Sequence, residues 1–188
     1  MLAASRWTEL PLTIKTTMNF ILKLKHWQVF LILIAGLFIS NFKIEDNQTL
    51  TTILLLTGMT IYFSWILFVG HGLYQLLPDK IDLNYNLFII NSFIWLTAYV
   101  VVMIISDGEG MTFNGLAALP GFYVFYAFLH FIMFPARTLK SIERGKKADI
   151  GECIGDFFLI VFLPIGIWFL QPRINKVTEG QKDNLITE

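Results

Sequence analysis

Three histidines, His26, His71 and His130, are the side chains best suited to chemistry, and the chain has no others. Imidazole binds zinc, copper and iron and ligates haem, so the three define a candidate metal site. His71 lies between two glycines in VGHGL, which allows a bulky group or another helix to approach closely. No two histidines are three or four residues apart, so no single helix presents a ligand pair. The alternative is structural: His26 beside Trp27 anchors at a membrane interface, and His130 bonds a neighbouring helix.

Glu152 and Asp156 form a second candidate site, because residues four apart share one face of a helix. Carboxylates in membrane segments carry cations or protons, so the pair is a candidate ion or proton pathway. The alternative is that both acids stabilise the start of a helix, where the helix dipole favours negative charge. Cys153 adds a thiol between them and, as the only cysteine, excludes an intrachain disulfide.

The clearest charged surface is the basic segment 135–149. We expect its positive side chains to attract anionic lipid headgroups, at about 1 kcal/mol for each residue. Leu139 and Ile142 are three residues apart, so a helical continuation would rest both on the membrane interface. The alternative is that the charges only fix the topology of the chain. The predicted headgroup-binding residues are Arg137, Lys140, Arg144, Lys146 and Lys147.

These residues belong to a chain that is 55% hydrophobic and 15% charged, whereas a soluble domain has about 25% charged residues. The apolar residues come in long blocks, and about 18 or more such residues cross the hydrocarbon layer as a helix. We therefore predict an all-α integral membrane protein, a bundle of about five transmembrane helices. The formal net charge of zero gives no reason to expect nucleic acid as a partner.

Four of the predicted helices are well delimited. Pro78 and Pro135 follow the second and fourth blocks, and proline ends or kinks a helix. The spacings Gly36-x-x-x-Ser40 and Gly151-x-x-x-Gly155 are suited to close helix packing. The four helices are expected at residues 27–42, 50–77, 83–105 and 116–134.

The fifth block is ambiguous. Counted from Phe157 to Leu170 it is too short to span, and counted from Ile150 it is long enough but includes the two acids. Pro164 and Gly166 weaken its middle, although membrane helices tolerate both residues. We expect this helix to span, with a re-entrant helix as the alternative.

The distribution of lysine and arginine places the N-terminus in the cytoplasm. The residues before the first helix and the segment 135–149 are basic, whereas the loop 106–110 is acidic. A spanning fifth helix would leave Arg173, Lys176 and Lys182 on the outer side, which favours the re-entrant alternative.

The chain divides into three expected parts. Residues 1–17 lack an apolar core and are expected to be a non-structured extension, or to precede the true start at Met18. Residues 18–177 form a single helical transmembrane domain, and residues 178–188 form a polar C-terminal tail.

The sequence LKHWQVFLIL near the start, together with FLPIGIWFLQPRINKV near the end, resembles an uncharacterised group of small bacterial polytopic inner-membrane proteins. The resemblance covers about Met18 to Val177. It implies a bacterial inner-membrane location. The group has no established activity, so the resemblance implies no catalytic or binding residue.

The chain contains no nucleotide loop, nucleophile elbow or zinc-protease motif. We therefore expect a non-catalytic partner, scaffold or accessory subunit of a membrane complex, in contact with other subunits or with itself. One alternative is a small oligomeric transporter or channel. A second is a metal- or haem-binding redox protein. The sequence predicts no particular cofactor or substrate.

Overall fold

The computed structural model describes residues 21–112 and 114–186, so the extension 1–17 and the proposed start at Met18 lie outside the described residues. The described residues form helices and no strand, which confirms the predicted all-α class. The elements are α3 (His26–Asn41), α4 (Gln48–Gln75), α5 (Tyr85–Ile105), the 3₁₀ helix η1 (Gly115–Ala118), α6 (Leu119–Arg144), α7 (Ile150–Val161) and α8 (Leu163–Ile186).

Within the described residues, α4, α5 and α6 are long and apolar enough to cross a membrane. Their length and composition indicate a membrane protein. α3 is apolar but has only 16 residues, and the fifth block is divided between α7 and α8. The expected count of about five spans is therefore not confirmed.

The bundle has two chemically different ends. One end carries the start of α3, the end of α4, the end of α6 and the start of α7, and it is named the basic end here. The other carries the α3–α4 loop and the α5–α6 loop, with Glu45, Asp46, Asp107 and Glu109, and it is named the acidic end. The Gln48 side chain donates a hydrogen bond to the Asp107 carbonyl, so the two loops lie together.

α3 and α4 approach closely through small residues, as the Gly36-x-x-x-Ser40 spacing predicts. A Cβ on Gly58 of α4 would lie 2.2 Å from the Gly36 carbonyl oxygen and 2.6 Å from the Ser40 nitrogen. The second spacing, Gly151-x-x-x-Gly155, is a wrong prediction, because a Cβ on either glycine would meet no atom within 4 Å. A small residue in such a spacing therefore serves helix packing only where another helix lies directly against it.

Phe88 of α5 is the centre of the packing between α4, α5 and α6. Its ring stacks on Phe134 at 4.2 Å and on Phe131 at 5.9 Å. Gly70 of α4 makes room for it, since a Cβ there would lie 2.7 Å from the end of the Phe88 ring. Because lipid is as apolar as these side chains, close van der Waals contact, rather than escape from water, holds the helices together.

α6 continues beyond the predicted end near Phe134. Pro135 lies inside the helix, which ends at Arg144. Gly145 follows it, with a φ of +63° that closes the helix in the left-handed conformation. Leu139 is buried in the core. The expectation that Leu139 rests on the membrane interface is therefore wrong, because the helix keeps this side chain against the bundle.

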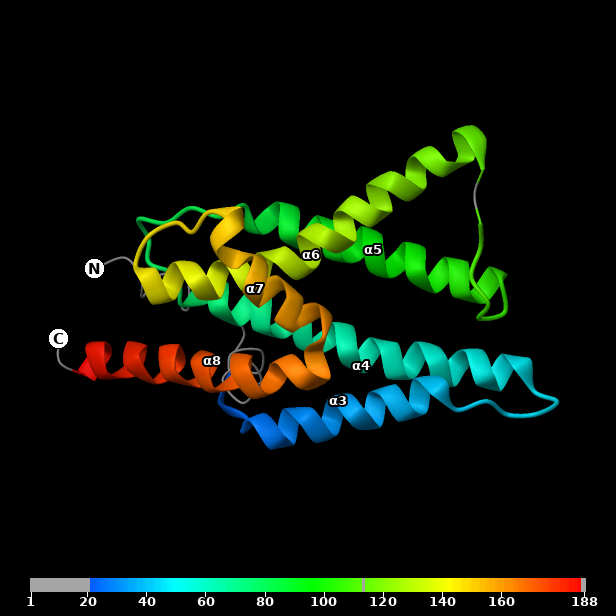
Figure 1. Ribbon diagram of the computed structural model, residues 1–188, viewed down its shortest axis with the longest axis horizontal. Coiled ribbons are helices and arrows are strands. Elements are labelled where there is room, and N and C mark those ends of the chain that lie inside the picture. The colour runs from blue at the N-terminus through cyan, green and yellow to red at the C-terminus, as the bar shows by residue number, and fades with distance from the viewer. Residues whose placement is uncertain (1–20, 113, 187–188) are drawn as a thin grey trace.

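The first turns of α6 leave the bundle. Figure 1 shows them diverging from α5 toward the acidic end. Phe122 is 70% exposed and Phe125 59% exposed, whereas Ala127, Phe131 and Ile132 farther along are buried. In the first turns of α6, the Tyr123 hydroxyl still donates to Asn91 Oδ1 of α5 at 3.2 Å, and close packing begins near Ala127.

The fifth block turns back instead of continuing as one helix. α7 ends at Val161, Phe162 leaves helical geometry, and α8 begins at Leu163 (Figure 1). Gly166 allows the turn to close, because a Cβ there would lie only 1.9 Å from the Leu159 carbonyl oxygen. α7 and α8 therefore form a helical hairpin.

The hairpin begins and ends at the basic end. The Gln171 Nε2 atom donates to the carbonyl oxygens of Leu22 at 3.3 Å and Leu24 at 3.0 Å, immediately before α3. The Asn175 side chain also donates to the Leu24 carbonyl, at 3.3 Å. The expectation that one helix continues across the bundle is therefore wrong, since at Gln171 the chain is back beside the start of α3.

Gly166→Ala should destabilise the hairpin by about 3 kcal/mol, because the new methyl group meets backbone that cannot move aside. Gly155→Ala on α7 is the matched control. It meets no atom within 4 Å and should raise stability slightly, because alanine favours a helix. Thermal unfolding of both variants in mild detergent measures the difference. Equal unfolding midpoints would contradict the tight turn.

Candidate functional site

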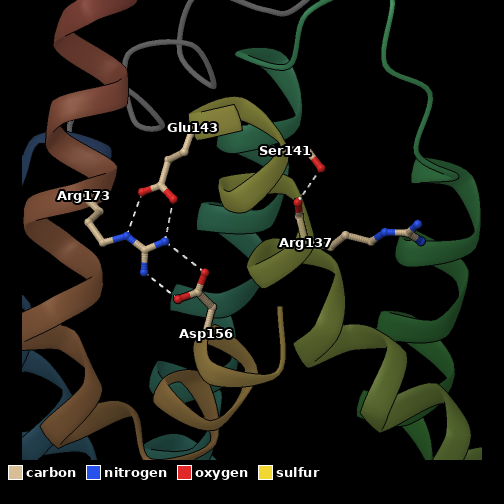
Figure 2. A network of polar contacts seen from close by, with 5 residues as sticks. All are labelled: Arg137, Ser141, Glu143, Asp156 and Arg173. Carbon is tan, nitrogen blue, oxygen red and sulfur yellow. Dashed lines mark hydrogen bonds and ion pairs between the residues drawn. The ribbon is translucent and has the colours of Figure 1, made fainter. Parts of the chain in front are cut away.

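Arg173 of α8 joins three helices at the basic end. Its guanidinium donates to Asp156 of α7 with Nη1–Oδ1 at 2.5 Å and Nη2–Oδ2 at 2.9 Å. It also donates to Glu143 of α6, with Nε–Oε1 at 2.7 Å and Nη2–Oε2 at 2.6 Å. Figure 2 shows the two carboxylates on two edges of the same guanidinium. These three residues are named the charge cluster.

Asp156 is the buried member of the charge cluster, and the other two side chains lie at the edge of the bundle. Asp156 is 6% exposed, and the side chains of Arg173 and Glu143 are 29% and 26% exposed. Hydrogen bonds to Glu143, and then to Asp156, raise the pKa of Arg173 above its ordinary value. Paired carboxylates that each accept two bonds from one arginine are among the strongest side-chain contacts in proteins, so the cluster fixes α8 against α6 and α7.

A second set of contacts closes the turn between α6 and α7. The Arg137 Nε atom donates to the Ala148 carbonyl at 2.8 Å, and the Ala148 N–H donates to Ser141 Oγ at 3.0 Å. Figure 2 shows the end of the Arg137 side chain pointing away from the charge cluster. Arg137 therefore positions the turn and is separate from the three-residue cluster.

Glu152 and Asp156, the predicted ion pathway, have different roles in the structure. Glu152 accepts from the Asp149 N–H in a capping box and pairs with Arg144. These two hydrogen bonds, in that order, hold the pKa of Glu152 below its ordinary value. Asp156 pairs with Arg173 instead. The capping interpretation therefore describes Glu152 and not Asp156.

Cys153, between the two acids, is buried in α7, and its thiol donates to the Asp149 carbonyl at 3.1 Å. Burial raises the pKa of this thiol above its ordinary value.

The three predicted metal ligands have three separate environments. The His26 ring lies 4.7 Å from the Trp168 ring, and His71 Nδ1 shares a hydrogen bond with the Tyr85 hydroxyl. His130 lies in α6, where its Nδ1 has no hydrogen-bond partner among the described residues. Within the same residues, no group of three or more His, Cys, Asp or Glu side chains could hold a metal ion. The structure therefore does not gather His26, His71 and His130 into one site.

The glycines beside His71 serve helix packing. Gly70 accommodates Phe88, and a Cβ on Gly72 would lie 2.8 Å from Leu22 before α3. The expectation that these glycines allow another segment to approach closely is confirmed, and the approaching groups are the protein's own side chains.

Two of the five predicted headgroup ligands have intramolecular partners. Arg137 bonds the Ala148 carbonyl and Arg144 pairs with Glu152, so both hold the α6–α7 turn. Lys146 and Lys147 are exposed beside them and Lys140 is half-buried. Headgroup binding by this segment stays a prediction, and the exposed lysines are its best-placed members.

Arg173, Glu143 and Gln171 were not among the sequence-predicted site residues. Arg173 looked like an ordinary tail charge, although it directly follows an apolar block that also contains an acid, Asp156. An acid and a base in or beside the same apolar block indicate an ion pair, because buried charges in proteins are usually paired. This signal could have predicted the contact between the two residues. Gln171 carries no comparable signal.

Comparisons of the chain with protein-family models, with curated proteins and with solved structures found no match.

Arg173→Met should lower the free energy of unfolding by about 3 kcal/mol, because Asp156 would stay buried without a counter-charge. Lys176→Met, one turn away and exposed, is the control and should change little. The double variant Arg173→Met, Asp156→Leu should recover most of the loss, since it removes the buried unpaired charge and leaves only Glu143, which reaches solvent. Thermal unfolding in detergent measures all three. A midpoint for Arg173→Met equal to that of the control would contradict the cluster's structural role.

Proposed function

We propose that the chain is a multipass protein of the bacterial inner membrane that acts as a non-catalytic partner, scaffold or accessory subunit of a membrane complex. The three long apolar helices and the resemblance to small bacterial inner-membrane proteins support the location. The absence of a catalytic motif in the sequence and the short loops support a role in binding other proteins.

The charge distribution supports a cytoplasmic basic end and N-terminus. Lys43 is the only lysine or arginine of the described residues at the acidic end. Because α8 returns beside the start of α3, Arg173 and Lys176 also belong to the basic end. The returning hairpin therefore removes the conflict with the positive-inside rule that a spanning helix would create. In this orientation α7 and α8 enter the membrane from the cytoplasmic side and leave on that side.

The first half of α6 is the observation on which the partner role rests. Its aromatic side chains Phe122, Phe125 and Tyr126 are exposed, and Gly121 among them has no atom within 4 Å of a built Cβ. A glycine with open space on an apolar helix allows a second helix to approach its backbone. Figure 1 shows this stretch diverging from α5 toward the acidic end.

The lipid bilayer is the second expected partner. Lys146 and Lys147 are exposed at the cytoplasmic basic end, next to the end of α6. Each positive charge at a membrane surface contributes about 1 kcal/mol of attraction to anionic lipid. We therefore expect the α6–α7 turn to contact anionic headgroups.

A photo-crosslinking amino acid at Phe122 or Phe125 should give one protein adduct in native membranes, of the same mass from both positions, because both positions face the same partner helix. The adduct is then identified as another membrane protein or a second copy of this chain. Ile104 of α5 and Phe38 of α3 are equally apolar and exposed, and they serve as controls that should give no such adduct. Only lipid adducts at all four positions would contradict the partner role.

A further inference from the structure

A cavity of about 490 Å³ lies against the turn of the α7–α8 hairpin. The turn forms one wall of it with Val161, Phe162, Pro164 and Ile165, and side chains of α3, α4, α5 and α6 form the others. Small-molecule sites measure roughly 300–1,000 Å³. The cavity therefore has the size of a ligand site, and all the long helices of the bundle contribute to it.

The cavity lies at the depth of the hydrocarbon layer. Met59 and Tyr62 line it from the middle of α4 and Trp95 from the middle of α5, and both helices are long and apolar enough to cross a membrane. The Tyr62 hydroxyl also donates to the carbonyl groups at the end of α7, which places the hairpin turn beside the middle of α4 (Figure 1). A ligand that reaches the cavity from outside the protein therefore comes from the apolar layer and not from water.

The hairpin is the reason that this space exists. α7 ends at Val161 and α8 begins at Leu163, so within the described residues neither helix extends beyond the turn toward the acidic end. A fifth helix that crossed the whole layer would continue past Leu37 of α3 and Tyr99 of α5, which instead line the cavity. The turn closes the cavity toward the basic end. An occupant therefore extends from the turn toward the acidic end.

The walls of the cavity are apolar and largely aromatic. Phe63, Trp95, Tyr99 and Phe128 line it, and the described lining contains no charged side chain. The Tyr62 hydroxyl is already bonded to the carbonyl groups of α7, so a polar ligand would lose its hydrogen bonds to water and regain few of them. An empty apolar cavity forfeits van der Waals contacts along its lining. The cavity therefore favours a hydrocarbon occupant.

The volume of the cavity selects a lipid chain over a protein helix. A helix with its side chains is about 10–12 Å wide and rises about 1.5 Å per residue, so this volume holds only about four of its residues. A single hydrocarbon chain is much narrower, and it bends by rotation about its carbon–carbon bonds. We propose that the cavity binds one hydrocarbon chain of a membrane phospholipid, which enters from the leaflet at the acidic end and reaches the hairpin turn with its methyl end.

Photolabelling with a phosphatidylethanolamine that carries a diazirine near the methyl end of one acyl chain tests the proposal. The delipidated protein is titrated with this lipid in mild detergent, and the labelled residues are located by mass spectrometry of its peptides. Labelling of Met59 and Phe128 in the cavity should saturate near one adduct per protein, whereas labelling of Ile32, exposed on α3, should rise in proportion to the added lipid. Labelling in the cavity that stays absent, or that rises without saturation as at Ile32, would overturn the proposal.

Two variants locate the bound chain. Ile165→Trp and Leu37→Trp each place a large side chain in the cavity, one from the hairpin turn and one from α3. Each should weaken the saturable labelling by about tenfold, because the lipid chain must then displace a packed side chain. Ile154→Trp on α7, an exposed isoleucine outside the lining, is the matched control and should label like the unaltered protein. Saturable labelling that persists unchanged in the folded cavity variants would overturn the proposal.

Discussion

The structure depends on the hydrogen bonds that the backbone carbonyl groups accept at the turn around Phe162. The last carbonyls of a helix have no partner within it, and an unsatisfied carbonyl in hydrocarbon costs several kcal/mol. The Tyr62 hydroxyl of α4 lies 3.0 Å from the Ile160 carbonyl oxygen and 3.1 Å from that of Val161, so one donor serves the end of α7. The Phe162 carbonyl accepts from Gly166 at 2.8 Å. With these hydrogen bonds, the turn leaves fewer carbonyl groups unsatisfied and is stable within an apolar layer.

The rest of the bundle follows from this hairpin. Because α8 returns, it packs beside α3, where the Trp168 ring meets His26 and Phe30. The charge cluster then joins the middle of α7 to the middle of α8, since Arg173 can reach Asp156 and Glu143 only if α8 comes back to the end of α6. The turn and the cluster therefore hold the hairpin at two separate places, and the short helix α3 gains a neighbour that a single spanning helix would not supply.

Some of this architecture was predictable from the sequence, for identifiable reasons. The long apolar blocks gave α4 and α5 nearly in full, because length and composition alone decide whether a helix can span. The prediction that α6 ends before Pro135 was wrong, because neighbouring helices in a membrane protein compensate for the backbone hydrogen bond that a proline removes. Pro164 and Gly166 did signal a weak middle in the fifth block, but neither residue shows that Tyr62, a hundred residues away, completes the turn. Contacts of that range leave no periodicity in one sequence.

In the candidate sites, too, local features were predictable from the sequence and contacts between distant segments were not. Glu152 as a helix cap follows from local sequence, whereas the pairing of Asp156 with Arg173 follows from the hairpin. The residue type suggested a histidine metal site, but residue type does not fix where each ring points, and the three rings face different neighbours.

The central claim is that α7 and α8 enter and leave the membrane on one side. Single cysteines at Lys146, Glu179 and Thr112, introduced into a Cys153→Ala background, test it by labelling with a membrane-impermeant maleimide in right-side-out and inverted vesicles. The account predicts that positions 146 and 179 react from the same side and position 112 from the opposite side. Labelling of position 179 together with position 112 would show that the fifth block spans, and would contradict the account.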